Sequence, residues 1–290
     1  MTDEDKYPVD TERRRFVKGV VGASVLAGVG TTASAAVNTL TAPSGEGGGV
    51  VNFKAVELLD GPAPRGMPQI PVEVDDEGYL RGIWPDVVTE RQAGREVTLA
   101  KTEAFKSSGV TYRGDWFQYC GVQTYPGVVP DAAEQNADLT NYFRYASGTP
   151  WLEEADADAG DRMHVDHFED YADWSNDFGS SGTGKPADGS WRSEGLDPSE
   201  TMPVEVIRSP IVEEAVAEAD ADSWIAAATN RGFIAHLNKC THFCCVPGFK
   251  TSNYQGSVSA TDRVYCQCHQ SIYDPFSIVD KSFTALPRPD

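Results

Sequence analysis

The chain has 290 residues, 40% of them hydrophobic, which is enough for one large domain or for two small ones with a tail. Its formal net charge is −20, from 44 acidic and 24 basic residues, so we expect no binding to nucleic acid, which is itself a polyanion. Such an acidic, solvated surface is typical of proteins from extreme halophiles, where salt screens the repulsion between like charges. A patch that binds cations or docks a basic partner is the alternative interpretation.

The N-terminus resembles an export signal. Arg13-Arg14-Arg15-Phe16-Val17-Lys18 is similar to the twin-arginine pattern, although Glu12 stands where Ser or Thr is usual. Residues 19–40 are uncharged and moderately apolar, and as a helix they could cross a hydrocarbon layer about 30 Å thick. Either the signal is cleaved near Ala33-Ser34-Ala35, or residues 19–40 remain as a membrane anchor with residues 1–18 in the cytoplasm.

The glycine-rich residues 41–49 are expected to form a flexible linker to a soluble domain over residues 50–290. Short apolar runs between Gly and Pro residues predict strands at 69–74, 96–100, 202–207, 223–227, 232–237 and 263–266. One helix is predicted at 211–219, with Ser209 as its cap and Pro210 in its first turn. Many short strands and few helices indicate a mostly β, antiparallel domain.

The middle of the chain is strongly acidic, with aromatic residues interleaved. We expect residues 109–199 to be a large insertion whose aromatics either form a small cluster of their own or dock a partner. Residues 179–189, rich in Gly and Ser, predict a loop. His164 and His167 could form a weak surface metal site, whereas His236, within a predicted strand, is expected to be structural.

Five of the six cysteines lie between residues 240 and 268, and this clustering points to a metal site. Box one is Cys240-Thr241-His242-Phe243-Cys244-Cys245, and box two is Cys266-Gln267-Cys268-His269-Gln270-Ser271. Two thiolates and two imidazoles can bind either tetrahedral zinc or a [2Fe–2S] cluster with two histidines on one iron. Zinc fingers usually place both cysteines together and both histidines together. Here each box supplies one thiolate, one imidazole and a further cysteine, which favours the cluster.

The pattern C-x-H-x-x-C followed by C-x-C-H-x-S resembles that of the Rieske subunits of quinol-oxidising cytochrome bc-type complexes. The close resemblance covers residues 232–289. It implies an antiparallel β-sandwich with a small cluster-binding part. By this resemblance, the inner iron is bound by the sulfurs of Cys240 and Cys266, and the outer iron by the imidazoles of His242 and His269. Cys245 and Cys268 would form a disulfide.

The resemblance extends to the surroundings of the cluster. Ser271 and Tyr273 fall at the positions of the family's hydroxyl donors, which stabilise the reduced cluster and raise its reduction potential. Residues 285–289 resemble the proline-rich loop that covers the cluster. The chain ends soon afterwards, so we expect the usual closing strands to be missing or short.

Three positions depart from the family pattern, which commonly has Gly at Cys244, Pro at Gln267 and Gly at Gln270. Because such glycines often adopt unusual backbone angles, the first loop could be reshaped, and Cys244 could replace Cys245 in the disulfide. With Cys245 in the disulfide, Cys244 and Cys120 are either free or paired with each other.

The function implied by the resemblance is that of an oxidoreductase subunit of the quinol–cytochrome c reductase type. The cluster would take one electron from quinol, with a proton going to His242 or His269, and pass it to a c-type cytochrome or a small copper protein. A cytochrome b-type membrane subunit would be the partner, and the domain would lie on the extracellular side of the cell membrane. The alternatives are a Rieske subunit of a membrane-bound terminal reductase such as nitrate reductase, a Rieske ferredoxin or oxygenase component, and a structural zinc protein.

Overall fold

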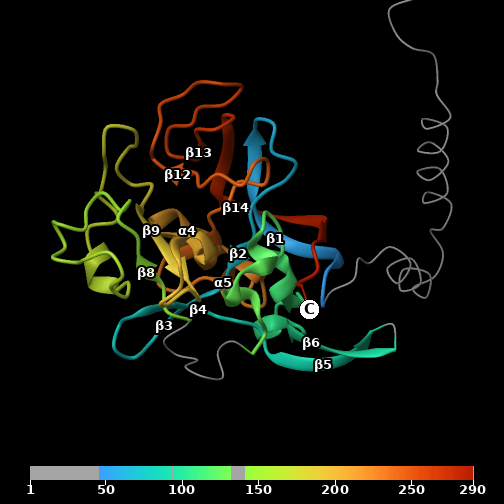
Figure 1. Cartoon of the computed structure of the whole chain (residues 1–290). Helices are drawn as coiled ribbons and strands as arrows, with labels where there is room; N and C mark the ends of the chain where they lie inside the picture. The colour runs from blue at the N-terminus through green and yellow to red at the C-terminus, as the bar shows by residue number, and fades with distance from the viewer. Residues whose placement is uncertain (1–45, 93, 132–140, 290) are drawn as a thin grey trace, which may run out of the picture. The chain divides into compact units, whose positions relative to one another are not determined.

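The computed structural model describes residues 46–92, 94–131 and 141–289, and within these ranges the chain is mostly β (Figure 1). Every described pair of strands is antiparallel, and the two α-helices in these ranges are short, so the prediction of a mostly β, antiparallel domain is confirmed. None of the described helices is long and apolar enough to cross a membrane. The export signal, the anchor and the start of the linker, all predicted before residue 46, lie outside the described residues.

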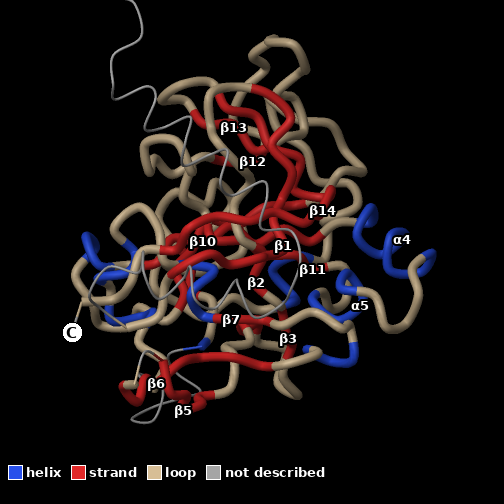
Figure 2. Tube along the Cα trace, turned by 90° about the vertical axis from the view of Figure 1, so that its right-hand side faces the viewer, coloured by secondary structure: helices blue, strands red, loops and turns tan. Residues whose placement is uncertain are grey.

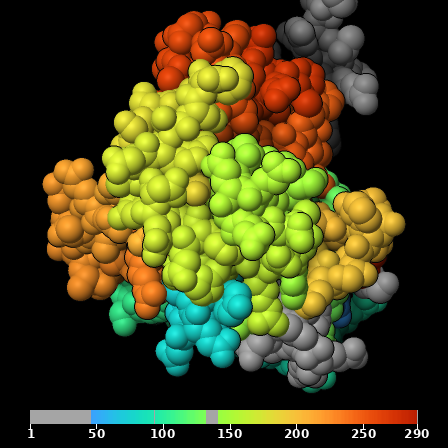
Figure 3. Space-filling model, turned by 90° about the vertical axis from the view of Figure 1, so that its left-hand side faces the viewer, coloured from blue at the N-terminus to red at the C-terminus, as the bar shows by residue number. Residues whose placement is uncertain are grey.

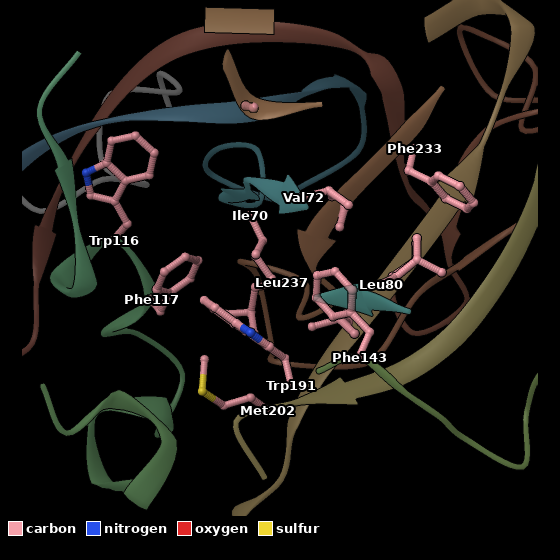
Figure 4. Close-up of a cluster of buried hydrophobic side chains, with 14 of the residues drawn as sticks. Ile70, Val72, Leu80, Trp116, Phe117, Phe143, Trp191, Met202, Phe233 and Leu237 are labelled. Atoms are coloured by element: carbon pink, nitrogen blue, oxygen red, sulfur yellow. The ribbon is translucent and has the colours of Figure 1, made fainter. Parts of the chain in front are cut away.

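A five-stranded sheet forms the centre of the fold, in the order β2 (Gln69–Ile70), β11 (Phe233–Leu237), β10 (Met202–Arg208), β9 (Lys185–Trp191) and β8 (Arg144–Tyr145). The strands predicted at 202–207 and 232–237 are its two central members. One face buries Val204, Val206 and Leu237 against an aromatic-rich core. Figure 4 shows Trp191, Phe117 and Phe143 of this core, where packed rings bury large apolar surfaces.

A four-stranded sheet follows the order β1 (Gly49–Asp60), β14 (Ser271–Ala285), β13 (Val264–Cys266) and β12 (Gly248–Phe249). β14 is the longest of the described strands and pairs with β1 from Asp60↔Ile272 to Gly49↔Ala285, and no strand follows it in the described residues. Alternate residues Val51, Phe53 and Ala55 of β1 are buried, as a half-buried strand requires. Figures 1 and 2 both place β12, β13 and the adjacent part of β14 together, away from β5 and β6.

The other strands form smaller sheets: β3 (Val72–Val74) with β4 (Leu80–Gly82), and β5 (Val87–Gln92) with β6 (Arg95–Thr102) and β7 (Tyr112–Arg113). The strand predicted at 69–74 is split at Pro71, which has no N–H for a sheet ladder. The predicted helix is confirmed as α4 (Pro210–Glu218), and the Ser209 hydroxyl accepts a hydrogen bond from the Ile211 N–H at 3.1 Å.

The strand predicted at 223–227 is wrong, because the structure has a helix there, α5 (Trp224–Ala228). Ser223 caps it by accepting a hydrogen bond from the Ala226 N–H. Trp224, Ala227 and Ala228 are buried at helical spacing, so the short apolar run that resembled a strand is one buried face of a helix.

The acidic middle segment is part of the main fold. It supplies β8 and β9, and Phe168 and Trp191 belong to the main core, which contradicts the expectation of a separate aromatic cluster. The predicted loop ends earlier than expected, since β9 begins at Lys185. The buried Lys250 side chain fixes this loop by donating to Ser180 O (2.7 Å) and Gly184 O (2.9 Å). Figure 3 shows the segment in yellow-green and yellow over one face of the molecule.

Residues 46–49, expected in the linker, are held in the fold. The backbones of Glu46 and Arg288 exchange two hydrogen bonds, and the Arg288 Nη2 lies 2.7 Å from the Glu46 carboxylate. A flexible connection would therefore have to lie before Glu46.

A row of polar side chains crosses the second face of the five-stranded sheet. Asp188, Glu205, His236 and Gln69 stand opposite one another on β9, β10, β11 and β2. Glu205 and His236 are each 1% exposed, and Glu205 accepts a hydrogen bond from the Phe249 N–H at 2.7 Å, which connects this sheet to β12. Burial raises the pKa of Asp188 to about 6 and that of Glu205 well above its usual range, and it lowers the pKa of His236 to about 3.

We predict that the Asp188→Asn variant is more stable than the wild type at pH 7 but not at pH 4. The pKa of Asp188 is higher in the folded protein than in the unfolded chain, so the folded protein binds the proton more tightly, and stability falls as the pH rises from about 4 to about 6. The size of the shift corresponds to roughly 2–3 kcal/mol in the free energy of unfolding. Denaturant titrations at both pH values measure it. The exposed Asp222→Asn is the control and should leave the pH profile unchanged. The prediction would be contradicted if the stability of the wild type did not fall relative to that of Asp188→Asn between pH 4 and pH 6.

Candidate metal centre

Box one lies in the loop after β11, and backbone hydrogen bonds close this loop tightly. The Cys240 N–H donates to Cys245 O at 2.7 Å, and the Cys244 N–H donates to Cys240 O at 3.0 Å. The Asn238 side-chain amide donates to Pro247 O at 2.8 Å, across the base of the loop. Main-chain geometry thus fixes where the side chains of box one point.

Box two forms the turn between β13 and β14, with Cys266 paired opposite Ser271. The Gln270 N–H donates to Cys266 O at 2.9 Å. Gln270 has a φ of 65° and Cys244 a φ of 63°, the left-handed region that glycine adopts most easily. These are the two positions where the resemblance expects glycine, so the backbone takes an unusual conformation at both although neither residue is glycine.

Cys240 and Cys266 are the two cysteines outside disulfides, and each is 1% exposed. Their thiols hydrogen-bond each other, and the Tyr273 hydroxyl lies 3.1 Å from the Cys240 Sγ. The bond from Cys266 lowers the pKa of Cys240 to about 5, helped by Tyr273 and by the N–H groups of His242 and Phe243. The same bond, together with burial, raises the pKa of Cys266. A lowered pKa favours the thiolate of Cys240, which is the form of cysteine that binds metals.

The two imidazoles of the boxes are in contact. The ring centroids of His242 and His269 are 4.7 Å apart, and the Phe243 ring packs against both. The Nδ1 atom of His242 is buried and has no hydrogen-bond partner among the described residues, so its lone pair is available to a metal. His269 is exposed, and this edge of the site reaches solvent.

Two hydroxyl groups from the start of β14 complete the site. The Tyr273 hydroxyl contacts the Cys240 sulfur, as described above. The Ser271 Oγ is fully buried and finds no partner in the described part of the chain. A buried hydroxyl without an acceptor costs about 1–3 kcal/mol, so a bound group that accepted its proton would remove this cost.

Two disulfides hold the boxes. Cys245 and Cys268 join box one to box two, with a Cα–Cα distance of 6.6 Å, which is the pairing that the resemblance implies. The sulfurs of Cys245, Cys266 and Cys268 lie within 4.8 Å of one another, so this bond passes close to a proposed ligand. Cys120 and Cys244 form the second disulfide, at 5.4 Å between Cα atoms, and tie box one to the middle segment. The sequence left the state of that pair open.

The segment that lies against the boxes is not the predicted one. Residues 285–289 stand at the far end of β14 from box two, where Leu286 bonds to Gln118, and Arg288 to Glu46 and Thr98. Residues 61–66, Gly61-Pro62-Ala63-Pro64-Arg65-Gly66, take that place, and we call them the cover loop. Gly61 packs directly on Gln270 and Ser271, and Ala63 is buried in the same cluster as Cys240 and Cys266. The two prolines between two glycines mark these residues as a loop, but they do not indicate what the loop covers.

His164 and His167 have structural partners. The Nε2 of His164 lies 2.8 Å from Glu77 O, its Nδ1 accepts a hydrogen bond from the Asp166 N–H, and the Nδ1 of His167 lies 3.0 Å from the Tyr145 hydroxyl. Burial lowers the pKa of His167. These bonds position both rings and do not converge on one point, so they do not favour the surface metal site considered for this pair.

The donors of the site fit a His-ligated [2Fe–2S] cluster. Two buried sulfurs and two imidazoles in contact are also a possible set for zinc, which needs only four such ligands. Zinc would leave the buried Ser271 hydroxyl without an acceptor, whereas the sulfides of a cluster accept hydrogen bonds of this kind. The buried Ser271 hydroxyl without a partner is therefore the feature that fits a cluster better than zinc.

No protein family, curated protein or solved structure matches this chain. Its own residues therefore carry the assignment of a function.

We predict that the unreduced, metal-free chain has two reactive thiols out of six cysteines. Alkylation in denaturant should add two labels, on Cys240 and Cys266, and six labels after reduction. Intact mass and peptide mapping measure both numbers. Four labels that include Cys120 and Cys244 would contradict the second disulfide, and labels on Cys245 and Cys268 would contradict the first.

Proposed function

We propose that the chain is a Rieske-type protein that binds one [2Fe–2S] cluster and carries one electron at a time. The observation that supports this most strongly is that the two boxes hold two buried thiols outside disulfides, two imidazoles in contact, and a buried hydroxyl without a partner among the described residues. Cys240 and Cys266 would hold one iron, and His242 and His269 the other. Such a cluster supplies a one-electron acceptor whose potential the surrounding residues adjust.

The hydroxyl groups of Ser271 and Tyr273 would favour the reduced state. Reduction adds negative charge to sulfur, and a hydrogen bond to sulfur becomes stronger as that charge grows. Tyr273 already lies at hydrogen-bond distance from Cys240, and Ser271 is buried without another acceptor. Both groups support a high-potential centre suited to quinol.

The imidazole edge would be the contact for quinol. His269 is exposed while the thiols are buried, so an external donor reaches a ring before it reaches sulfur. A neutral imidazole can accept the hydrogen bond of a quinol hydroxyl and take its proton while the electron leaves. Phe243 and Val246, 64% and 58% exposed, give this edge an apolar rim that suits a quinol or a membrane partner.

In this proposal the chain is an oxidoreductase subunit of a quinol-oxidising complex at the cell membrane. A cytochrome b-type membrane subunit would provide the quinol site, and a c-type cytochrome or a small copper protein would take the electron. Movement between the two would depend on residues before Glu46, because Glu46 itself is bonded to Arg288.

The deciding experiment is metal analysis with spectroscopy on protein purified from membranes. We expect two irons and two sulfides per chain and a rhombic EPR signal in the reduced state. The midpoint potential should fall as the pH rises above neutrality, because an iron-bound imidazole that loses its proton disfavours the electron. One zinc and no iron would overturn the proposal. A strongly negative midpoint that does not vary with pH would replace the quinol function with that of a ferredoxin.

The matched histidine variants are His269→Ala and His164→Ala. We expect His269→Ala to lose the rhombic signal and His164→Ala to keep it. His269 lies in the site against His242, whereas His164 is bonded to Glu77 elsewhere.

We predict that Tyr273→Phe and Ser271→Ala each lower the midpoint potential by roughly 60 mV. Each removes one hydrogen bond that strengthens on reduction, worth about 1.4 kcal/mol, and 59 mV is a tenfold change for one electron. Tyr265→Phe is the control, because Tyr265 stands on the neighbouring β13 and packs against Tyr254. EPR-monitored redox titration at one pH compares the three. Unchanged potentials in both test variants would show that the hydroxyls do not serve the cluster.

A further inference from the structure

The guanidinium group of Arg65, in the cover loop, lies among three aromatic rings. Its central carbon is 3.8 Å from the centroid of Phe283, 4.4 Å from that of Tyr119 and 5.2 Å from that of Phe53. Cation–π contacts at these distances are favourable, and the Arg65 side chain is half-buried. The side chain is thus held in one place.

No carboxylate accompanies this charge. The one hydrogen bond of the Arg65 side chain goes to Gly66 O at 3.4 Å, and it forms no ion pair within the described ranges. This is unusual in a chain with 44 acids and 24 bases, because buried charges normally have an ionic partner. Arg65 therefore contributes a positive charge that nearby acids do not cancel.

The cover loop brings this charge close to the thiols. The Thr241 hydroxyl, between Cys240 and His242 in the chain, donates to Arg65 O at 2.5 Å. The guanidinium lies over the ring of Tyr119, and the Tyr119 hydroxyl donates to Lys239 O at 2.7 Å, directly before Cys240 in the chain. Ala63 and Met67, on either side of Arg65, pack in the apolar cluster that contains both thiols.

We propose that Arg65 is a fixed positive charge that raises the affinity of the metal centre for an electron, an inference that rests on the proposed function. Reduction adds one negative charge beside Cys240, and a cation in the same poorly solvated region stabilises that state more than the oxidised one. Arg65 does not touch the ligands, so it acts through the field and not as a catalytic residue. The negative charge of the thiolates and of the reduced centre would balance the positive charge of Arg65, which has no carboxylate partner among the described residues.

The test separates charge from packing by means of two variants of Arg65. Arg65→Met keeps the long stem among the rings but removes the charge, so the equilibrium constant for reduction should fall about tenfold, about 59 mV for one electron. Arg65→Lys keeps the charge and should stay within about twofold of the wild type. EPR-monitored titration gives the midpoint, and iron content per chain confirms that each variant holds its cluster.

Arg263→Met is the matched control, because Arg263 is 32% exposed and lies 3.4 Å from Asp274. Its removal should leave the constant within about twofold. The Arg65→Met difference should persist in molar salt, since a charge enclosed by rings is screened much less than a surface charge.

Three results would overturn the inference. Arg65→Met could keep the wild-type midpoint, Arg65→Lys could fall as far as Arg65→Met, or the difference could vanish in molar salt. If Arg65→Met does not retain iron, Arg65→Gln replaces it with the same expected fall. A wild-type chain with no rhombic EPR signal would instead defeat the proposed function, and this inference with it.

Discussion

The packing of the buried thiols of Cys240 and Cys266 in one apolar cluster is the constraint on which the rest of the site depends. Box one follows a central strand of the five-stranded sheet, and box two is the turn of a hairpin in the other sheet. An ionised sulfur in an apolar cluster is costly unless several donors surround it. Tyr273 and the backbone N–H groups of His242 and Phe243 are those donors, and the Cys245–Cys268 disulfide keeps the two loops from separating.

Two disulfides and one hydrogen bond fix box one to three other parts of the chain. The Cys245–Cys268 bond joins it to box two, the Cys120–Cys244 bond joins it to the middle segment, and Thr241 bonds to the cover loop. Cys120 and Cys244 both have positive φ values, which side chains other than glycine adopt at some cost. The surroundings, including the covalent bond, maintain this conformation. A ligand loop restrained in this way loses little further freedom when it binds a metal, which favours binding.

The sequence was most informative where chemistry requires fixed spacing. The two boxes predicted which residues come together, since thiolate and imidazole ligands tolerate few alternatives at those intervals. Strands with apolar periodicity, such as β10 and β11, were also predictable. The strand at 223–227 was not, because a run of five apolar residues fits a buried helix as well as a strand. The role of the cover loop was hidden as well, since nothing local in residues 61–66 reveals that they fold back over boxes that lie more than 170 residues later.

The many acidic residues oppose the proposed affinity of the site for an electron. How strongly each charged residue acts depends on its distance from the site. Each surface carboxylate disfavours an added electron, but the Debye length is about 3 Å in molar salt, so exposed acids act over little more than contact range. Asp188 and Glu205 stand opposite each other on the five-stranded sheet, where burial raises the pKa of both groups and thereby reduces their negative charge. The cation of Arg65 lies among the rings of Phe53, Tyr119 and Phe283, and the Tyr119 hydroxyl is bonded to the backbone directly before Cys240. A chain can therefore carry a net charge of −20 and still present a positive field at its buried sulfurs.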